Sequence, residues 1–124
     1  MPQRNAPIFV LDSGLGGLTV ARALLQRLPG ERVVYFGDTA RLPYGSKTRQ
    51  TVTSFVRQII AWGADHCRPK HVVIACNTAS ALALSQLRPE FAPMVVSGVV
   101  EPGARAAAAA AGRHETPAIG VIAT

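Results

Sequence analysis

The chain of 124 residues has few of the side chains that cross-link a small protein or bind metal. It holds two cysteines, Cys67 and Cys76, and three isolated histidines. Cys67 lies in a helix-end context and Cys76 at the end of a strand, so the pair does not resemble a disulfide framework. Since no CxxC pair or histidine cluster has the spacing of metal ligands, we expect no metal site.

Long apolar runs and an export signal are also missing. No run approaches the roughly 20 residues of a transmembrane helix, and residues 1–7 contain no apolar core of a signal peptide. With 48% hydrophobic residues and a mean hydropathy of +0.22, the composition suits one compact soluble domain. We therefore expect a cytoplasmic protein with no membrane partner.

Acidic residues are few, with 7 Asp and Glu against 13 Lys and Arg, which gives a net charge of +6. The basic side chains are scattered along the chain instead of forming a block, a pattern typical of a solvated surface. We therefore expect no nucleic acid as partner. A nucleotide- or nucleic-acid-binding α/β module stays open as the alternative outside enzymology.

Short apolar runs alternate with helical patterns along the first hundred residues. Strands are expected at residues 7–11, 32–36, 71–75 and 94–96, and helices at residues 18–28, 48–67 and 79–87. This alternation predicts the α/β class, a parallel sheet with helices on both faces. The buried stripe of the first helix is expected to consist of Leu18, Ala21, Leu25 and Leu28.

The composition shifts after residue 98. Residues 98–103 are expected to form a connector and residues 105–111 an alanine-rich helix that Gly112 ends. Residues 117–124 are expected to form another buried strand.

Polar clusters follow three of the predicted strands. They are Asp12-Ser13, the loop from Asp38 to Gly45, and Cys76-Asn77-Thr78. Because the carboxyl ends of parallel strands meet at one edge of a sheet, we expect these clusters to line one pocket. Cys76 also precedes a predicted helix, whose N-terminal N–H groups and dipole favour a thiolate or a substrate carboxylate.

Gly14-Leu15-Gly16, with Asp38 after the next strand, partly matches the fingerprint of dinucleotide-binding proteins. That fingerprint needs a small residue at position 19, where this chain has Thr19. Asp12 would also bring a negative charge toward the pyrophosphate. Both features count against a dinucleotide site.

Nucleophilic chemistry at Cys76 would require a histidine beside the thiol. The nearest in sequence, His71, is expected at the other end of the same strand, about 16 Å away at about 3.3 Å per residue. A thiol and a carboxylate without an electron sink fit proton transfer to and from carbon best.

Several segments of the chain form a set of motifs in a fixed order. They are FVLDSGLGG at 9–17, YFGDTA at 35–40 with PYG at 43–45, ACNTAS at 75–80, and the stretches 98–103 and 119–122. Together they resemble the glutamate racemases of the cofactor-independent aspartate/glutamate racemase superfamily. The resemblance implies a two-base enzyme that interconverts L- and D-glutamate without pyridoxal phosphate, metal or other cofactor, and that supplies D-glutamate for peptidoglycan.

By this resemblance, Cys76 removes or returns the Cα proton on one face of the substrate. Asp12 lies beside this base and the substrate ammonium, where it favours the zwitterionic carbon acid. The residues expected to hold the carboxylates and backbone of the substrate are Ser13, Pro43, Tyr44, Gly45, Asn77, Thr78 and Thr124.

The chain departs from the family in its extent. Family members are longer and have two similar lobes across the substrate, the second lobe carrying another cysteine in a Cys-Thr-His context. The other cysteine here, Cys67, is expected to be structural. We therefore expect residues 1–98 to form an incomplete N-terminal lobe, residues 99–124 to begin the second, and the chain to be inactive alone.

Glutamate is the expected small-molecule partner, and another acidic amino acid such as aspartate is the alternative substrate. A homodimer is left open for the full-length protein.

Overall fold

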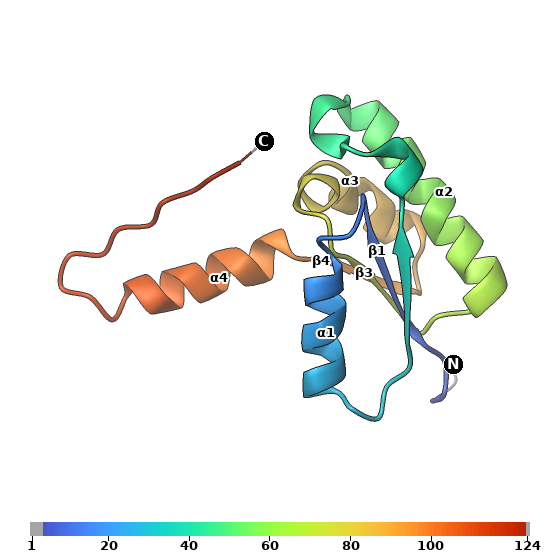
Figure 1. Ribbon diagram of the computed structural model, residues 1–124, viewed down its shortest axis with the longest axis horizontal. Helices are drawn as coiled ribbons and strands as arrows, with labels where there is room; N and C mark the ends of the chain where they lie inside the picture. Colours follow the sequence, from blue (N-terminus) through green and yellow to red (C-terminus); the bar gives the residue numbers. More distant parts are fainter. Residues whose placement is uncertain (1–3, 124) are drawn as a thin grey trace.

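The computed structural model describes residues 4–123, in which four parallel strands form one sheet (Figure 1). The strands are β1 (Ile8–Asp12), β2 (Val33–Gly37), β3 (His71–Ile74) and β4 (Val95–Gly98). Their order in the sheet is β2-β1-β3-β4, with a helix in each crossover. The prediction of an α/β fold with a parallel sheet is confirmed.

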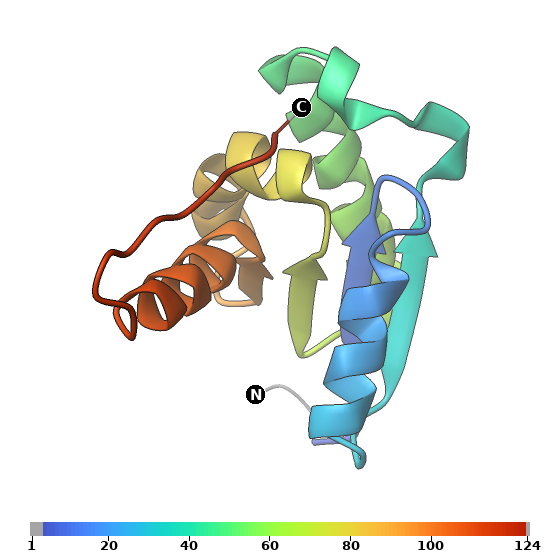
Figure 2. The same ribbon diagram turned by 60° about the vertical axis from the view of Figure 1, so that its left-hand side comes forward.

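The register brings the carboxyl ends of the three strands that carry the polar clusters to the same level. In β1, Asp12 is opposite Gly37 of β2, and Leu11 is opposite Ile74 of β3. Figure 2 shows the arrowheads of β1, β2 and β3, in dark blue, cyan and olive, pointing toward one end of the sheet. Residues that follow these strands therefore meet at one edge.

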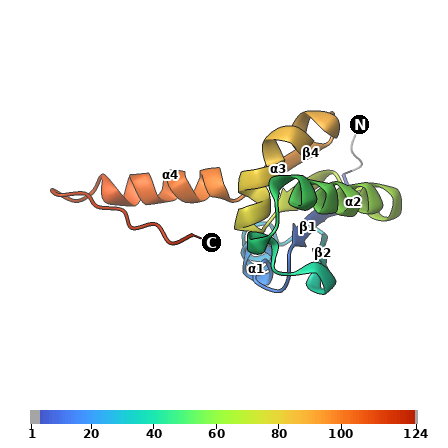
Figure 3. The ribbon, with the colours of Figure 1, turned by 90° about the horizontal axis from the view of Figure 1, so that it is seen from above.

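Helices cover the two faces of the sheet unequally. The larger core lies between the sheet and helices α2 (Arg49–Cys67) and α3 (Asn77–Glu90), and the smaller one lies against α1 (Leu18–Arg27) (Figure 3). Alternation along β1 divides its apolar side chains between them: Phe9 and Leu11 enter the larger core, Ile8 and Val10 the smaller. Burying each large apolar side chain contributes about 1.5–3 kcal/mol.

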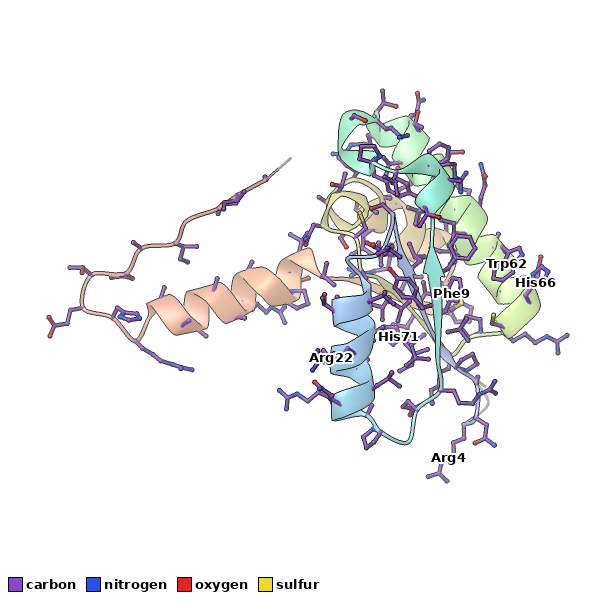
Figure 4. The ribbon with its side chains drawn as sticks, in the orientation of Figure 1. Arg4, Phe9, Arg22, Trp62, His66 and His71 are labelled. Atoms are coloured by element: carbon purple, nitrogen blue, oxygen red, sulfur yellow. The ribbon has the colours of Figure 1, made fainter. Side chains whose placement is uncertain are left out.

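Helix α2 begins and ends where the sequence predicts. Thr48 caps it, its side-chain oxygen accepting a hydrogen bond from the N–H of Thr51 at 3.1 Å. After Cys67, Arg68 adopts a left-handed conformation with φ 46°, which ends the helix. On its outer surface the rings of Trp62 and His66 stack with centroids 4.4 Å apart (Figure 4).

The predicted stripe of helix α1 is wrong except at Ala21. Ala21 is buried, whereas Leu18, Leu25 and Leu28 are each nearly half exposed. The helix lies very close to the sheet at its N-terminus, since a Cβ on Gly17 would be 2.6 Å from the Cβ of Asp12. Ala21 fits this close approach, Val20 and Leu24 also pack against the smaller core, and Leu18, Leu25 and Leu28 face outward.

The structure also corrects the C-terminal half. Helix α3 starts at Asn77, not at residue 79, and continues past Pro89 to Glu90. Helix α4 spans Val100–Ala111 and so includes most of the expected connector. Its Pro102 is tolerated because the first turn of a helix needs no intrahelical N–H donor there.

Helix α4 projects away from the sheet and buries none of its residues (Figures 1 and 2). Residues 117–123 do not form the predicted buried strand; they are extended and exposed, with Val121 84% and Ile122 102% accessible. No strand lies beside them in the described part of the chain, and an isolated strand has neither hydrogen-bond partners nor a face to bury. Among residues 4–123, no helix is long and apolar enough to cross a membrane.

Candidate active site

The three predicted clusters do come together at the carboxyl edge of the sheet. The N–H of Asp38 donates to the carbonyl of Asp12 at 2.9 Å, and the N–H of Ala75 donates to that of Leu11 at 2.8 Å. These bonds extend the sheet ladder on both sides of β1 to the residues that carry the candidate side chains. Asp12, Asp38 and Cys76 are each only 6–7% exposed.

Cys76 is the N-cap of helix α3. Its backbone is extended, and its Sγ accepts a hydrogen bond from the N–H of Ala79 at 3.4 Å. The thiol donates to the hydroxyl of Ser13, with Sγ and Oγ 3.5 Å apart. A negative charge on this sulfur would be stabilised by the helix N–H groups and dipole. The geometry therefore places a sulfur that accepts one hydrogen bond and donates another at the N-terminus of α3.

Asp12 is held by the glycine-rich turn that follows it. Its Oδ2 accepts hydrogen bonds from the N–H of Gly14 at 3.0 Å and of Gly17 at 3.1 Å. A dinucleotide would need N–H groups of this turn for its pyrophosphate, and the protein's own carboxylate already uses two of them. The turn therefore orients a carboxylate instead of offering an anion site.

Tyr35 joins this cluster, although sequence reasoning did not select it. Its hydroxyl donates to the carbonyl of Gly14 at 2.7 Å and lies 3.4 Å from Oδ2 of Asp12. Burial, followed by the charge of Asp12, raises the pKa of Tyr35 to about 12. The period of two along β2 could have indicated it, because Tyr35 shares a sheet face with Gly37, the register partner of Asp12.

A second tyrosine anchors the loop after β2, which contains short 3₁₀ turns at Thr39–Arg41 and Tyr44–Ser46. Tyr44 is 1% exposed, and its hydroxyl donates to Oδ2 of Asp38 at 2.5 Å. The Nε of Arg41 donates to the same oxygen at 2.7 Å. Burial, followed by the hydrogen bond to Asp38, raises the pKa of Tyr44.

The hydroxyl of Tyr44, one of the residues predicted to hold the substrate, is bonded to Asp38. Pro43 and Gly45, on either side of it, are exposed. The buried phenol of Tyr44 fixes the backbone of residues 43–45. The exposed parts of this segment are Pro43 and Gly45. Arg41 also lies over the ring of Phe55 of α2, 4.0 Å from its centroid, which ties the loop to that helix.

The remaining predicted residues flank Cys76. Ser13 and Thr78 are half-buried and Asn77 is exposed, so the first turn of α3 and the turn after β1 frame the thiol. Thr124 lies outside the described residues.

Two other candidates lie elsewhere. Cys67, half-buried, ends α2 just before the amino end of β3, at the opposite edge of the sheet from Cys76. His71 begins β3, with its Nε2 2.8 Å from Oγ of Ser97, and burial lowers its pKa. Neither side chain joins the cluster at the carboxyl edge.

The candidate site is an open edge and not an enclosed cavity. A groove of about 580 Å³ lies between α3 and α4, lined by residues such as Leu84, Arg88 and Arg105. It includes neither Asp12 nor Cys76. Residues 4–123 contain no group of three His, Cys, Asp or Glu side chains that could hold a metal ion.

Comparison with known proteins gives one consistent result. No family model matches the chain. A glutamate racemase from Gloeothece citriformis is 51% identical to it over 121 residues, which are 98% of this chain and 41% of that protein. Isoform RacE1 of glutamate racemase from Bacillus anthracis superposes with a TM-score of 0.80 at 43% identity, over 86% of this chain and 40% of that one.

The glutamate racemase of Francisella tularensis, solved in complex with D-glutamate, has a TM-score of 0.77 and 41% identity over 82% of this chain and 38% of that one. The chain therefore spans about two fifths of the length of the proteins it matches.

Proposed function

We propose, from the homology of this chain to glutamate racemases, that it contributes one face of an enzyme that interconverts L- and D-glutamate. In this proposal, residues 1–98 form the N-terminal lobe and residues 99–124 begin a second lobe. The observation that carries the proposal is the position of Cys76. Its thiol caps helix α3 at the edge of the sheet and lies next to Ser13. Ser13 belongs to the turn whose N–H groups hold Asp12.

The reaction is a proton exchange at Cα. The Cys76 thiolate takes the Cα proton of one enantiomer and becomes a thiol, while the electron pair of the C–H bond stays on the substrate as a carbanion. An acid on the opposite face then donates a proton to Cα and gives the other enantiomer. In the reverse direction Cys76 is the acid. The second base is not among the residues placed at this edge, and we assign it to the second lobe.

Neighbouring groups support this exchange. Asp12 provides a fixed negative charge beside the substrate ammonium, which keeps the substrate zwitterionic and its Cα proton more acidic. The N–H groups at the start of α3, with Ser13, Asn77 and Thr78, bind a substrate carboxylate. The backbone of Pro43, Tyr44 and Gly45 contributes further donors and acceptors, and Thr124 is a further proposed contact.

The proposed racemase function also concerns location, product and assembly. D-glutamate made in the cytoplasm would supply peptidoglycan synthesis, and the full-length enzyme is compatible with a homodimer. The racemase of Francisella tularensis was solved with D-glutamate, which favours glutamate over aspartate as the substrate here. A nucleotide-binding function is disfavoured because Asp12 uses the turn's N–H groups itself.

Substitution of Cys76 in the full-length protein tests the proposal. Cys76→Ser keeps an N-cap oxygen for α3, so the fold should survive while the base is lost. Cys76→Ala removes both the cap and the base. We expect each to lower the racemisation rate at least about 10³-fold, because general bases contribute about 10²–10⁴. The readouts are D-glutamate formed from L-glutamate and deuterium entry at Cα in heavy water.

Cys67→Ala is the matched control, because it removes the chain's other thiol far from the edge. Its activity should stay within about twofold of the wild type, since Cys67 has no part in positioning the site. Equal losses in the Cys67 and Cys76 variants would refute the assignment of the base. An inactive wild-type protein would refute the racemase itself, and a preference for aspartate in a parallel assay would refute the substrate.

A further inference from the structure

Two residues of strand β2, Tyr35 and Gly37, lie against the carbonyl of Gly14 in the turn after β1. The Tyr35 hydroxyl donates to this carbonyl at 2.7 Å. Two residues further along, Gly37 packs so closely that a Cβ there would be 2.4 Å from the same oxygen. A neighbouring strand thus fixes the position of a single peptide group in the glycine-rich turn.

The orientation of Asp12 depends on this turn. Oδ2 accepts the N–H groups of Gly14 and Gly17 and lies 3.4 Å from the Tyr35 hydroxyl. The Gly14 carbonyl lies in the turn between the N–H of Gly14 and the N–H of Gly17, the two donors that hold Oδ2. A displacement of this carbonyl would therefore shift the turn and, with it, the carboxylate of Asp12.

We propose that Tyr35 is a positioning residue for the Asp12 carboxylate, acting through the Gly14 carbonyl; this inference rests on the proposed racemase function. Its hydroxyl has one hydrogen, which goes to the nearer acceptor, Gly14, and the longer approach to Asp12 is secondary. The phenol is protonated, and therefore a donor, at neutral pH, as any tyrosine is. Tyr35 does not touch the substrate in this scheme.

A double-mutant cycle in the full-length protein tests this role. The four proteins are the wild type, Tyr35→Phe, Asp12→Asn and the double variant. Tyr35→Phe removes only the hydroxyl, and we expect kcat to fall about tenfold with KM for glutamate changed less than about threefold. In the Asp12→Asn background the same change should alter kcat less than about twofold, because its effect passes through the carboxylate.

Val33→Ala is the matched control for packing. Val33 lies on the same face of β2 and packs against the same apolar cluster, but its register partner is Ile8, at the opposite end of β1 from Asp12. It should lower the unfolding temperature without changing kcat more than about twofold. A loss of kcat in Val33→Ala equal to that in Tyr35→Phe would show a general packing effect and overturn the inference.

The remaining outcomes separate this inference from the proposed function. If the wild type racemises glutamate but Tyr35→Phe keeps its kcat, or loses the same factor with and without Asp12, the positioning role is wrong. If the wild type exchanges no Cα proton, the racemase function and this inference fail together. Gly37→Ala, whose added Cβ would lie 2.4 Å from the same carbonyl, should reproduce the fall in kcat.

Discussion

At the scale of single residues, the two tyrosines explain how buried carboxylates are held at the edge of the sheet. They are the only tyrosines of the chain. Tyr35 holds the turn of Asp12, and Tyr44 bonds directly to Asp38. Burial, and then the neighbouring carboxylate, raises the pKa of each phenol, so each stays neutral to higher pH than a free tyrosine.

This arrangement predicts an abnormal tyrosine titration. With the pKa of Tyr35 at about 12 and that of Tyr44 also raised, the folded chain should show little tyrosinate absorbance at pH 10, where a free tyrosine is half ionised. In denaturant both phenols should titrate near pH 10. A folded chain with one tyrosine half ionised at pH 10 would contradict the structure.

The same shifts set the sign of the stability change at alkaline pH. Because the folded-state pKa values lie above those of the unfolded chain, the stabilising contribution is complete below pH 10. It is lost as the pH rises from about 10 through about 12, where the unfolded state releases its protons first. The free energy of unfolding, measured by urea titration at a series of pH values, should therefore fall across this window.

At the scale of elements, the fold depends on how closely helices approach the sheet. Gly63 allows helix α2 to pack directly against Phe9 of β1, because an added Cβ at this position would be 2.7 Å from the Phe9 ring. Phe9 itself is completely buried and also contacts Phe36 and Trp62. The ring cannot move away without disturbing this aromatic cluster.

Gly63→Ala should therefore destabilise the chain although alanine favours helix. The gain in helix propensity is about 1 kcal/mol, and overpacking against Phe9 costs about 1–3 kcal/mol. We expect a net loss in the free energy of unfolding, measured by urea denaturation. Gly103→Ala in α4 is the control, because nothing lies within 4 Å of its position. It should increase helicity by circular dichroism; a stabilised Gly63→Ala would contradict the packing.

At the scale of the whole molecule, the candidate residues of the described chain gather at one edge of the sheet. The candidate residues line an open edge, and α4 leads away from it (Figure 2). Apolar side chains on α1 and in residues 117–123 are exposed, and such surfaces mark places where further protein packs. A two-base exchange at Cα needs acids on both faces of the substrate.

The chain of 124 residues by itself should therefore not racemise glutamate. In heavy water it should incorporate no deuterium at Cα above the background of the Cys76→Ala variant, while the full-length protein under the same conditions should do so. Turnover by the short chain at the rate of the full-length protein would show that one lobe is sufficient.

Local sequence patterns determined the elements of the first hundred residues and the positions of the candidate site residues at the strand ends. Apolar runs separated by helical periods specified a parallel sheet, and strand ends specified Asp12, the loop after Gly37, and Cys76. The N-caps at Thr48 and Cys76 were also local, because capping involves residues within one turn. These features need no knowledge of distant neighbours.

Only the tertiary structure decided which side chains are covered and which are paired. In and just after α1, Leu18, Leu25 and Leu28 follow a helical period with Ala21, but only Ala21 of these four is buried, and Val20 and Leu24 pack beside it. Residues 117–123 have strand composition, yet no neighbouring strand covers them. The bond from Tyr35 to the Gly14 turn depends on register between strands more than 20 residues apart, and a local pattern contains no information on that register.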